Sequence, residues 1–298
     1  MNPAFHIIDV IVVVIYLFII VALGLWVSRK KNGKEKTTED YFLAGKSLPW
    51  WAIGASLIAA NISAEQFIGM SGSGFAGGFA VASYELMAAL TLIIVAKFFL
   101  PIFIKQGIYT IPEFVEKRYS TQLKTILAVF WLSLFIFINI TSVLFLGGKA
   151  IDTIIGVGDG SFIIPAIIIL AIIAACYSLY GGLSAVAWTD VLQVVLLVIG
   201  GILTTIIALQ AVSPDGTILQ GIQYVSERAG DRFDLILSKD NPEYQNLPGI
   251  MMLIGGLWVA NLYYWGFNQY IIQRAFAAKS VPEAQKGLIF AGFLKMLI

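Results

Sequence analysis

The residues best suited to chemistry in this chain are polar side chains that interrupt two long apolar segments. The first segment, WWAIGASLIAANISAEQFIGMSGSG, contains Asn61, Glu65 and Gln66. The second segment, NLPGIMMLIGGLWVANLYYWGFNQYIIQR, contains Asn261 and Tyr264. Amides and hydroxyls offer donors and acceptors to a neutral polyhydroxylated ligand, and the apolar face of a pyranose can lie on an aromatic ring. These residue types favour the binding of such a ligand.

Residues for covalent or metal chemistry are scarce. The chain contains one histidine, His6, and one cysteine, Cys176. A single histidine excludes an HExxH motif, and no Ser/His or Cys/His pair can be assembled at a catalytic depth. A single cysteine also excludes an intrachain disulfide. We therefore expect no enzymatic activity and no organic cofactor.

The two interrupted segments also correspond in position. Each has a small residue followed by asparagine near its middle, Ala60-Asn61 and Ala260-Asn261, and each begins a set of about five apolar segments. Paired interruptions in two repeats indicate a transporter's binding site, where unwound backbone offers carbonyls to a cation and half-helix ends to a substrate. The alternative is two kinked helices whose polar residues make interhelical hydrogen bonds.

The composition places these segments in a membrane. Of the 298 residues 59% are apolar and 12% are charged, and the mean hydropathy is +0.86. Soluble domains have about 45–50% apolar and about 25% charged residues. The net charge of +1 provides no field for binding nucleic acid. We expect a membrane protein whose partners are the lipid bilayer and a small solute.

Uncharged runs of about 20 residues indicate helices that span the hydrocarbon layer. They predict seven spans and the start of an eighth, which begins near Leu288. The seven predicted spans cover residues 10–27, 47–84, 86–104, 125–148, 160–189, 191–214 and 244–273. A membrane β-barrel would show short alternating segments instead. The sequence therefore predicts an all-α polytopic fold.

Lysine and arginine predict the orientation. The loops on one side carry thirteen of these residues, and those on the other side carry four. The positive-inside rule places the richer side in the cytoplasm, and hence the N-terminus outside. The polar loop 213–247 then also lies outside. We expect a multi-pass protein of the cytoplasmic membrane.

Four stretches carry a resemblance to a known family: TTEDYFLAGKSLPWWAIGASLIAANISAEQFIGMSGSG, YTIPEFVEKRY, YGGLSAVAWTDVLQV and GGLWVANLYYWGFNQYIIQR. The chain resembles the sodium:solute symporter family, and within it the bacterial sodium/galactose (sodium/glucose) cotransporters. The resemblance runs from about residue 37 to the end of the chain. The glycine pair that is typical of the family is present as Gly181-Gly182.

The resemblance implies a five-plus-five inverted-repeat (LeuT-like) fold in one transmembrane domain, 1–298, with the second and seventh helices discontinuous. The implied parts are an accessory first helix at 7–29, a first repeat at 47–212, an external loop at 213–247 and the start of a second repeat at 248–298. Because the chain stops in the eighth helix, we expect it to be a fragment of a longer protein.

The resemblance also implies roles for individual residues. The sugar would be bound by Gln66, Glu85, Asn261 and Lys295, with Tyr264 against it. The gates would be Met70 and Tyr84 on the outer side, and Tyr264, held by Asn61, on the inner side. Sodium would be bound by the backbone carbonyls of Ala59 and Ile62, and Asp190 would lie on its exit path.

The function expected from these features is sodium-coupled symport of a galactose- or glucose-like hexose by alternating access, with sodium as the co-transported ion. One departure bears on sugar preference, because Ala88 stands where sugar transporters of the family can have a serine. Two alternatives remain open at this point. One is a sodium symporter for another small solute, and the other is a membrane-bound sensor that binds a solute without transport.

Overall fold

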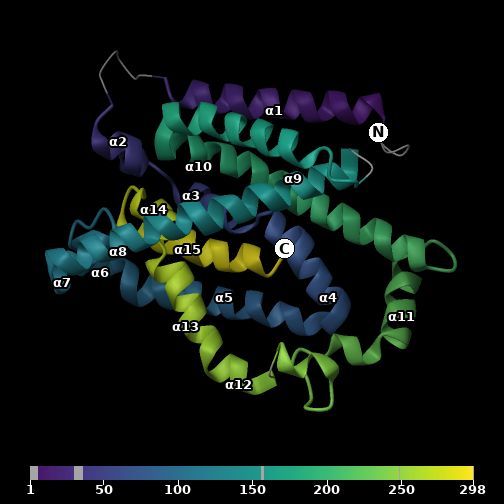
Figure 1. Ribbon diagram of the computed structural model, residues 1–298. Helices are drawn as coiled ribbons and strands as arrows, with labels where there is room; N and C mark the ends of the chain where they lie inside the picture. The colour runs from purple at the N-terminus through teal and green to yellow at the C-terminus, as the bar shows by residue number, and fades with distance from the viewer. Residues whose placement is uncertain (1–5, 30–35, 156–157, 248, 298) are drawn as a thin grey trace.

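The computed structural model describes residues 6–29, 36–155, 158–247 and 249–297, and within them the fold is helical (Figure 1). An isolated parallel bridge joins Leu48 to Ala278. The first eight helices are α1 (Ile7–Val27), α2 (Thr38–Leu43), α3 (Trp50–Asn61), α4 (Ser71–Gly77), α5 (Ala82–Ile94), α6 (Leu100–Lys105), α7 (Ile111–Arg118) and α8 (Thr121–Leu134). The others are α9 (Thr141–Ile155), α10 (Ile163–Val212), α11 (Ile218–Arg228), α12 (Gly249–Ile254), α13 (Gly256–Leu262), α14 (Gln269–Phe276) and α15 (Val281–Lys295).

Four π-helical turns extend or join the α-helices. Val95–Phe99 joins α5 to α6, and Phe135–Ile140 joins α8 to α9. Gln66–Met70 leads into α4, and Tyr263–Phe267 extends α13. By length and apolar composition, four helical stretches of the described chain could cross a membrane: 7–27, 66–105, 121–155 and 163–212. The bent pair 242–254 and 256–267 would add a fifth. The predicted second and eighth spans contain α3 and α15, which have 12 and 15 residues.

Glycines place two of the turns between spans at positions that differ from the prediction. The second span ends at Gly77, not at Tyr84, because Gly78 has a φ of 70° and the third span starts soon after it. The fifth and sixth spans both lie within α10 and meet at Gly182, not near Asp190. Gly182 has φ 63° and ψ −156°, a conformation that residues other than glycine rarely adopt.

The eighth span also begins earlier than predicted, at Val281 instead of near Leu288. Ser280 caps this helix by accepting a hydrogen bond from the Glu283 amide. The Glu283 carboxylate in turn accepts from the Trp50 amide at 2.9 Å, at the start of α3. The charged residue Glu283 therefore lies in the first turn of α15, where its carboxylate connects the start of α15 to the start of α3.

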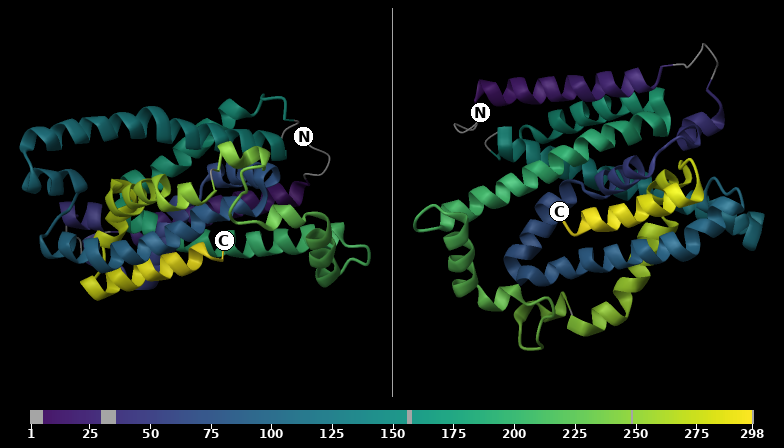
Figure 2. Two further views of the ribbon diagram at one scale, coloured as in Figure 1. Left: turned by 90° about the horizontal axis from the view of Figure 1, so that it is seen from below. Right: turned by 180° about the vertical axis from the view of Figure 1, so that it is seen from behind.

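The centre of the molecule is α3, most of which is buried, and α15 packs along it. Helix α1 lies at one edge beside α10, as Figure 2 shows on the right. Helices α2 and α7 lie at one end of the molecule, and α11 lies at the other (Figure 1). The described parts of the loops that are rich in lysine and arginine therefore lie at the opposite end from the predicted external loop.

The short helix α2 is tied to three other parts of the chain. The Tyr41 hydroxyl donates to the Leu179 carbonyl at 2.9 Å, just before the turn in α10. The Phe42 carbonyl accepts from Gln273 of α14 at 2.7 Å. Glu39 accepts from the Tyr109 hydroxyl at 3.0 Å, in the loop after the third span. Helix α2 thus joins the ends of the third, fifth and seventh spans.

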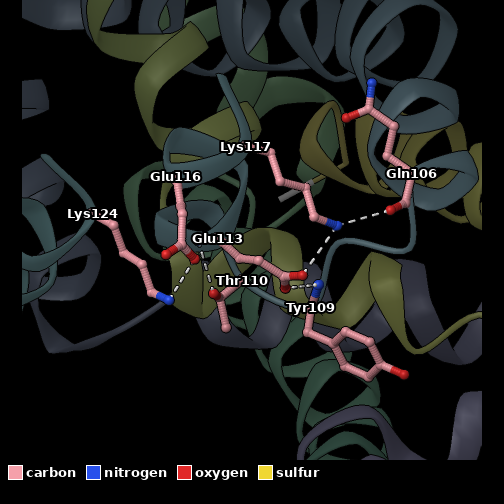
Figure 3. Close-up of polar contacts among 7 residues, drawn as sticks. All are labelled: Gln106, Tyr109, Thr110, Glu113, Glu116, Lys117 and Lys124. Atoms are coloured by element: carbon pink, nitrogen blue, oxygen red, sulfur yellow. Dashed lines mark hydrogen bonds and ion pairs between the residues drawn. The ribbon is translucent and has the colours of Figure 1, made fainter. Parts of the chain in front are cut away.

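A network of charged side chains connects α7 to its neighbours (Figure 3). Lys124 of α8 pairs with Glu116 at 2.6 Å, and Lys117 pairs with Glu113 at 3.2 Å. The hydrogen bond from Lys124 lowers the pKa of the Glu116 carboxyl below its ordinary value. The Glu113 carboxylate also accepts from the Tyr109 amide at 2.9 Å. These contacts fix the position of α7 between the end of the third span and the start of the fourth.

Candidate functional site

The second span is broken in its middle. Helix α3 ends at Asn61, and Ile62 is extended, with φ −82° and ψ 115°. In an unbroken helix the amide of Ser63 would donate to the Ala59 carbonyl, but here it donates to Gln66 Oε1 at 2.8 Å. The amide of Gln66, which would donate to the Ile62 carbonyl, donates to the Ser63 carbonyl at 3.1 Å instead. The break therefore releases the carbonyls of Ala59 and Ile62 from the helical hydrogen-bond ladder.

The seventh span is interrupted twice. At the first, the helical segment Pro242–Ile254 is bent by 75° relative to the segment Gly256–Phe267. At the second, Asn268 has φ −77° and ψ 119°, and α14 continues beyond it. The segment 256–267 lies between the two interruptions and carries Asn261, Tyr264 and Trp265. Both segments that the sequence singled out are thus discontinuous.

A hydrogen bond joins the breaks of the second and seventh spans. Asn61 Nδ2, in the last turn of α3, donates to the Tyr264 hydroxyl at 3.0 Å. The same hydroxyl lies 2.8 Å from the hydroxyl of Tyr270, on the other side of the interruption at Asn268. The structure therefore brings together two residues that are about 200 positions apart in sequence, and adds a third that the sequence analysis did not single out.

Beside this junction lies a buried ion pair. Lys295 Nζ of α15 contacts Glu85 Oε2 of α5, and 4% of the Lys295 side chain and 22% of the Glu85 side chain are exposed. The ammonium also lies 5.7 Å from the centre of the Trp265 ring. The Tyr264 ring meets Trp265 edge-to-face at 5.1 Å. The third, seventh and eighth spans thus meet at one group of charged and aromatic side chains.

The polar groups of this region are largely bonded within the protein. Asn261 Nδ2 donates to the Leu257 carbonyl at 3.0 Å, Gln66 accepts from Ser63, and Lys295 pairs with Glu85. The carbonyl oxygen of the Asn61 side chain is buried and has no hydrogen-bond partner among the described residues. A polyhydroxylated ligand would therefore replace existing hydrogen bonds and satisfy this free acceptor.

The two residues expected at the outer gate lie in different surroundings. Met70 packs with Tyr244 and Met252 against a separate apolar cluster that includes part of the predicted external loop. The buried members of this cluster are Ala80, Val81, Leu237 and Leu247. Tyr84 precedes Glu85 on α5, and 40% of its surface is exposed. The structure therefore places Met70 and Tyr84 in separate environments.

Asp190 lies in a buried polar cluster that joins three spans. Its Oδ2 accepts from Ser56 of α3 at 2.5 Å and lies 3.3 Å from Nη2 of Arg274 on α14. Arg274 Nε donates to Ser56 Oγ at 2.8 Å. A buried charge is costly unless it is paired and hydrogen-bonded, and each member of this cluster satisfies the others.

Three residues of these networks are not expected from the sequence. Ser56 lies in an apolar run with no signal beyond its hydroxyl, and Arg274 follows directly after the predicted seventh span, 244–273, where a basic residue is typical of a cytoplasmic loop. Tyr270 had a weak signal, since it follows Tyr264 at a distance of six residues in a span already rich in aromatic residues. Glu65, whose charge required a partner, accepts from Ser142 of α9 at 2.6 Å.

Comparison with known proteins identifies the family of this chain. The family model described as "Sodium:solute symporter family" matches residues 41–298. A sodium/glucose cotransporter of Vibrio parahaemolyticus is 64% identical over 98% of this chain and 53% of its own length. Sodium/glucose cotransporter 1 of Ovis aries is 35% identical over 97% of this chain and 45% of its own length. The chain belongs to the sodium:solute symporter family.

A solved structure shares the fold of this chain. It is described as the substrate-bound outward-open state of a Na⁺-coupled sialic acid symporter, and the match has a TM-score of 0.81 at 24% identity. The match covers 98% of this chain and 58% of that chain. The chain spans about half the length of the curated relatives it matches. The chain belongs to a family of sodium:solute symporters, and it has several helices that are long and apolar enough to cross a membrane. It is therefore a membrane protein.

Proposed function

We propose that the protein couples the entry of sodium to the uptake of a galactose- or glucose-like hexose by alternating access. The observation that carries this proposal is the junction of the two helix breaks, where Asn61 donates to Tyr264 beside the buried Glu85–Lys295 pair. Discontinuous spans of this kind place polar backbone and side chains at the middle of a membrane. The names of the two cotransporter relatives support a sugar as the solute.

The sugar would lie against Tyr264 and bond to the polar groups around it. Gln66, Glu85, Asn261 and Lys295 provide amide, carboxylate and ammonium groups, which together can donate to and accept from sugar hydroxyls. Each of these groups now bonds within the protein, so the sugar would exchange partners with them. Tyr264 would close the inner side of the site, and Met70 and Tyr84 the outer side.

Sodium would bind at the break of the second span. A hard cation prefers oxygen ligands, and the carbonyls of Ala59 and Ile62 no longer accept from the amides that an unbroken helix would supply. The Gln66 side chain maintains this arrangement by occupying the Ser63 amide. Asp190 would lie on the inward exit path, where the contact with Arg274 now neutralises it.

The same proposal assigns the parts of the chain. Helix α1 would be the accessory first helix, residues 47–212 the first repeat, and 248–298 the start of the second repeat. The protein would lie in the cytoplasmic membrane with its N-terminus and the loop 213–247 outside. It would be a carrier without enzymatic activity, organic cofactor or nucleic-acid partner.

Uptake into proteoliposomes tests this function in the protein expressed from its natural reading frame. We expect labelled galactose or glucose to accumulate only when an inward sodium gradient is present. Potassium in place of sodium is the control for coupling, and sialic acid and proline are the control solutes. Sugar uptake that is indifferent to sodium would refute the coupling. If only a control solute is taken up with sodium, the assignment of a sugar as the transported solute is wrong. Sugar binding without uptake would favour a membrane-bound sensor.

A further inference from the structure

We propose that Tyr270 is a positioning residue for the inner gate, and that its hydroxyl holds Tyr264 in the closed position. This inference rests on the proposed function, because it concerns the ring that would close the inner side of the sugar site. Tyr270 lies beyond the interruption of the seventh span at Asn268. The Tyr264 hydroxyl is therefore held both by the second span, through Asn61, and by the part of the seventh span that follows the interruption, through Tyr270.

The Tyr264 hydroxyl is engaged from two sides. Asn61 Nδ2 donates to it at 3.0 Å from the end of α3, and the Tyr270 hydroxyl lies 2.8 Å away on α14. A phenol has one donor and two acceptor positions, so it can take both bonds at once. The two bonds approach from different helices, and together they restrict the rotation of the ring more than either bond alone.

Tyr270 is itself held firmly. Its ring meets Phe135 edge-to-face at a centroid distance of 5.7 Å and Tyr264 at 6.1 Å. Its backbone carbonyl accepts a hydrogen bond from Arg274 Nη1. Arg274 in turn pairs with Asp190, the acid proposed for the sodium exit path. Tyr270 therefore lies between the gate ring and the buried cluster around Asp190.

The two bonds to the Tyr264 hydroxyl determine how often the gate opens. Movement of Tyr264 away from the closed position requires that its bonds to Asn61 and Tyr270 both break. Loss of the Tyr270 hydroxyl leaves the ring packing in place and removes one of the two bonds. One net hydrogen bond in a protein corresponds to roughly a two- to tenfold change in an equilibrium. The closed gate of Tyr270→Phe should therefore open more often by that factor.

The test compares Tyr270→Phe with Tyr263→Phe in proteoliposomes of the protein expressed from its natural reading frame. Tyr263 is a matched control, since it lies in the same span and 41% of its surface is exposed. The first readout is efflux of preloaded galactose without sodium on either side. The second readout is hydrogen exchange of the segment 262–270, which does not depend on which solute is carried. We expect Tyr270→Phe to raise both by roughly two- to tenfold over Tyr263→Phe.

A double variant shows whether the effect passes through Tyr264. In a Tyr264→Phe background, Tyr270→Phe should add little to either readout, because the hydroxyl that it bonds is already absent. Equal leak and equal exchange in Tyr270→Phe and Tyr263→Phe would overturn the inference. Faster exchange without faster leak would show that the hydroxyl only stabilises the helix interruption, and would overturn the gate role. If the unmodified protein carries no sugar, the proposed function fails, and hydrogen exchange alone decides whether Tyr270 holds Tyr264.

Discussion

At the scale of single residues, the Glu85–Lys295 pair is the most unusual feature of the site. Two opposite charges attract strongly in the protein interior, where water is scarce. Either charge alone would carry a large desolvation cost there. The Lys295 side chain is buried, and its ammonium lies near the Trp265 ring. Its two members come from α5 and α15, so that the pair also holds the third span against the eighth.

Removal of one member should therefore cost more than removal of both. We expect Lys295→Met to lower the free energy of unfolding by about 3 kcal/mol, because it leaves the Glu85 carboxylate without its counter-ion. The double variant Lys295→Met with Glu85→Gln should recover part of this loss. Unfolding of the purified protein in mild detergent measures both. A double variant that is less stable than Lys295→Met would contradict this account of the pair.

The amide of Asn261 provides a second test at this scale. It is 8% exposed and donates to Leu257 one turn earlier in its own helix, so it contributes little to contacts between helices. Asn261→Ala should weaken sugar binding about tenfold, while the free energy of unfolding falls by about 1 kcal/mol. Asn246→Ala, in the loop before α12, is the matched control. Unchanged sugar affinity in Asn261→Ala would place the sugar elsewhere.

At the scale of elements, the turn inside α10 depends on a glycine. A Cβ atom at Gly182 would lie 2.4 Å from the Tyr41 carbonyl oxygen of α2, and the backbone there has a positive φ. The carbonyl of Leu179, just before this turn, is bonded by the Tyr41 hydroxyl. Helix α2 therefore packs against the turn and bonds one of the carbonyls beside it.

Gly182→Ala should destabilise the protein for both reasons. The backbone conformation alone costs about 1–3 kcal/mol for a residue with a Cβ, and the clash with Tyr41 adds to it. Gly200→Ala in the same helix is the control, because a Cβ there meets no atom of the described chain within 4 Å. Thermal unfolding in detergent compares the two variants. Similar melting temperatures would show that the turn tolerates a side chain.

The elements could be predicted from the sequence to different degrees. Long apolar runs and the polar residues inside them were sufficient to predict helical spans and two discontinuous ones. The sequence predicts the turn near Asp190 instead of at Gly182, because an acidic residue in an apolar run is typical of a loop. Asp190 is helical and buried, and its carboxylate is paired with Arg274, 84 positions later. A contact of that range leaves no local pattern.

The start of α15 was missed for a related reason. Glu283 and Lys286 looked like loop residues, yet Glu283 lies in the first helical turn and accepts from the Trp50 amide. For the site, residue types were sufficient to single out Asn61, Gln66 and Asn261. The resemblance was needed to relate Asn61 to Tyr264, and neither source indicated Tyr270.

At the scale of the whole molecule, the basic loops and the predicted external loop lie at opposite ends. This arrangement predicts the labelling of cysteines in a Cys176→Ala background. Asp240→Cys should react with an impermeant thiol reagent in intact cells, and Gln122→Cys should react only after the membrane is opened. Both positions are exposed in the structure. The reverse pattern would place the N-terminus in the cytoplasm.

The two buried ion pairs bear on how the molecule responds to a membrane voltage. Glu85 with Lys295 and Asp190 with Arg274 are each electrically neutral as units. A voltage of 100 mV acts with about 2.3 kcal/mol on each elementary charge that crosses the membrane, but it does no net work on a neutral pair that moves as one body. Electrical work on these parts of the protein therefore cancels, and in the proposed mechanism the co-transported cation would carry the current.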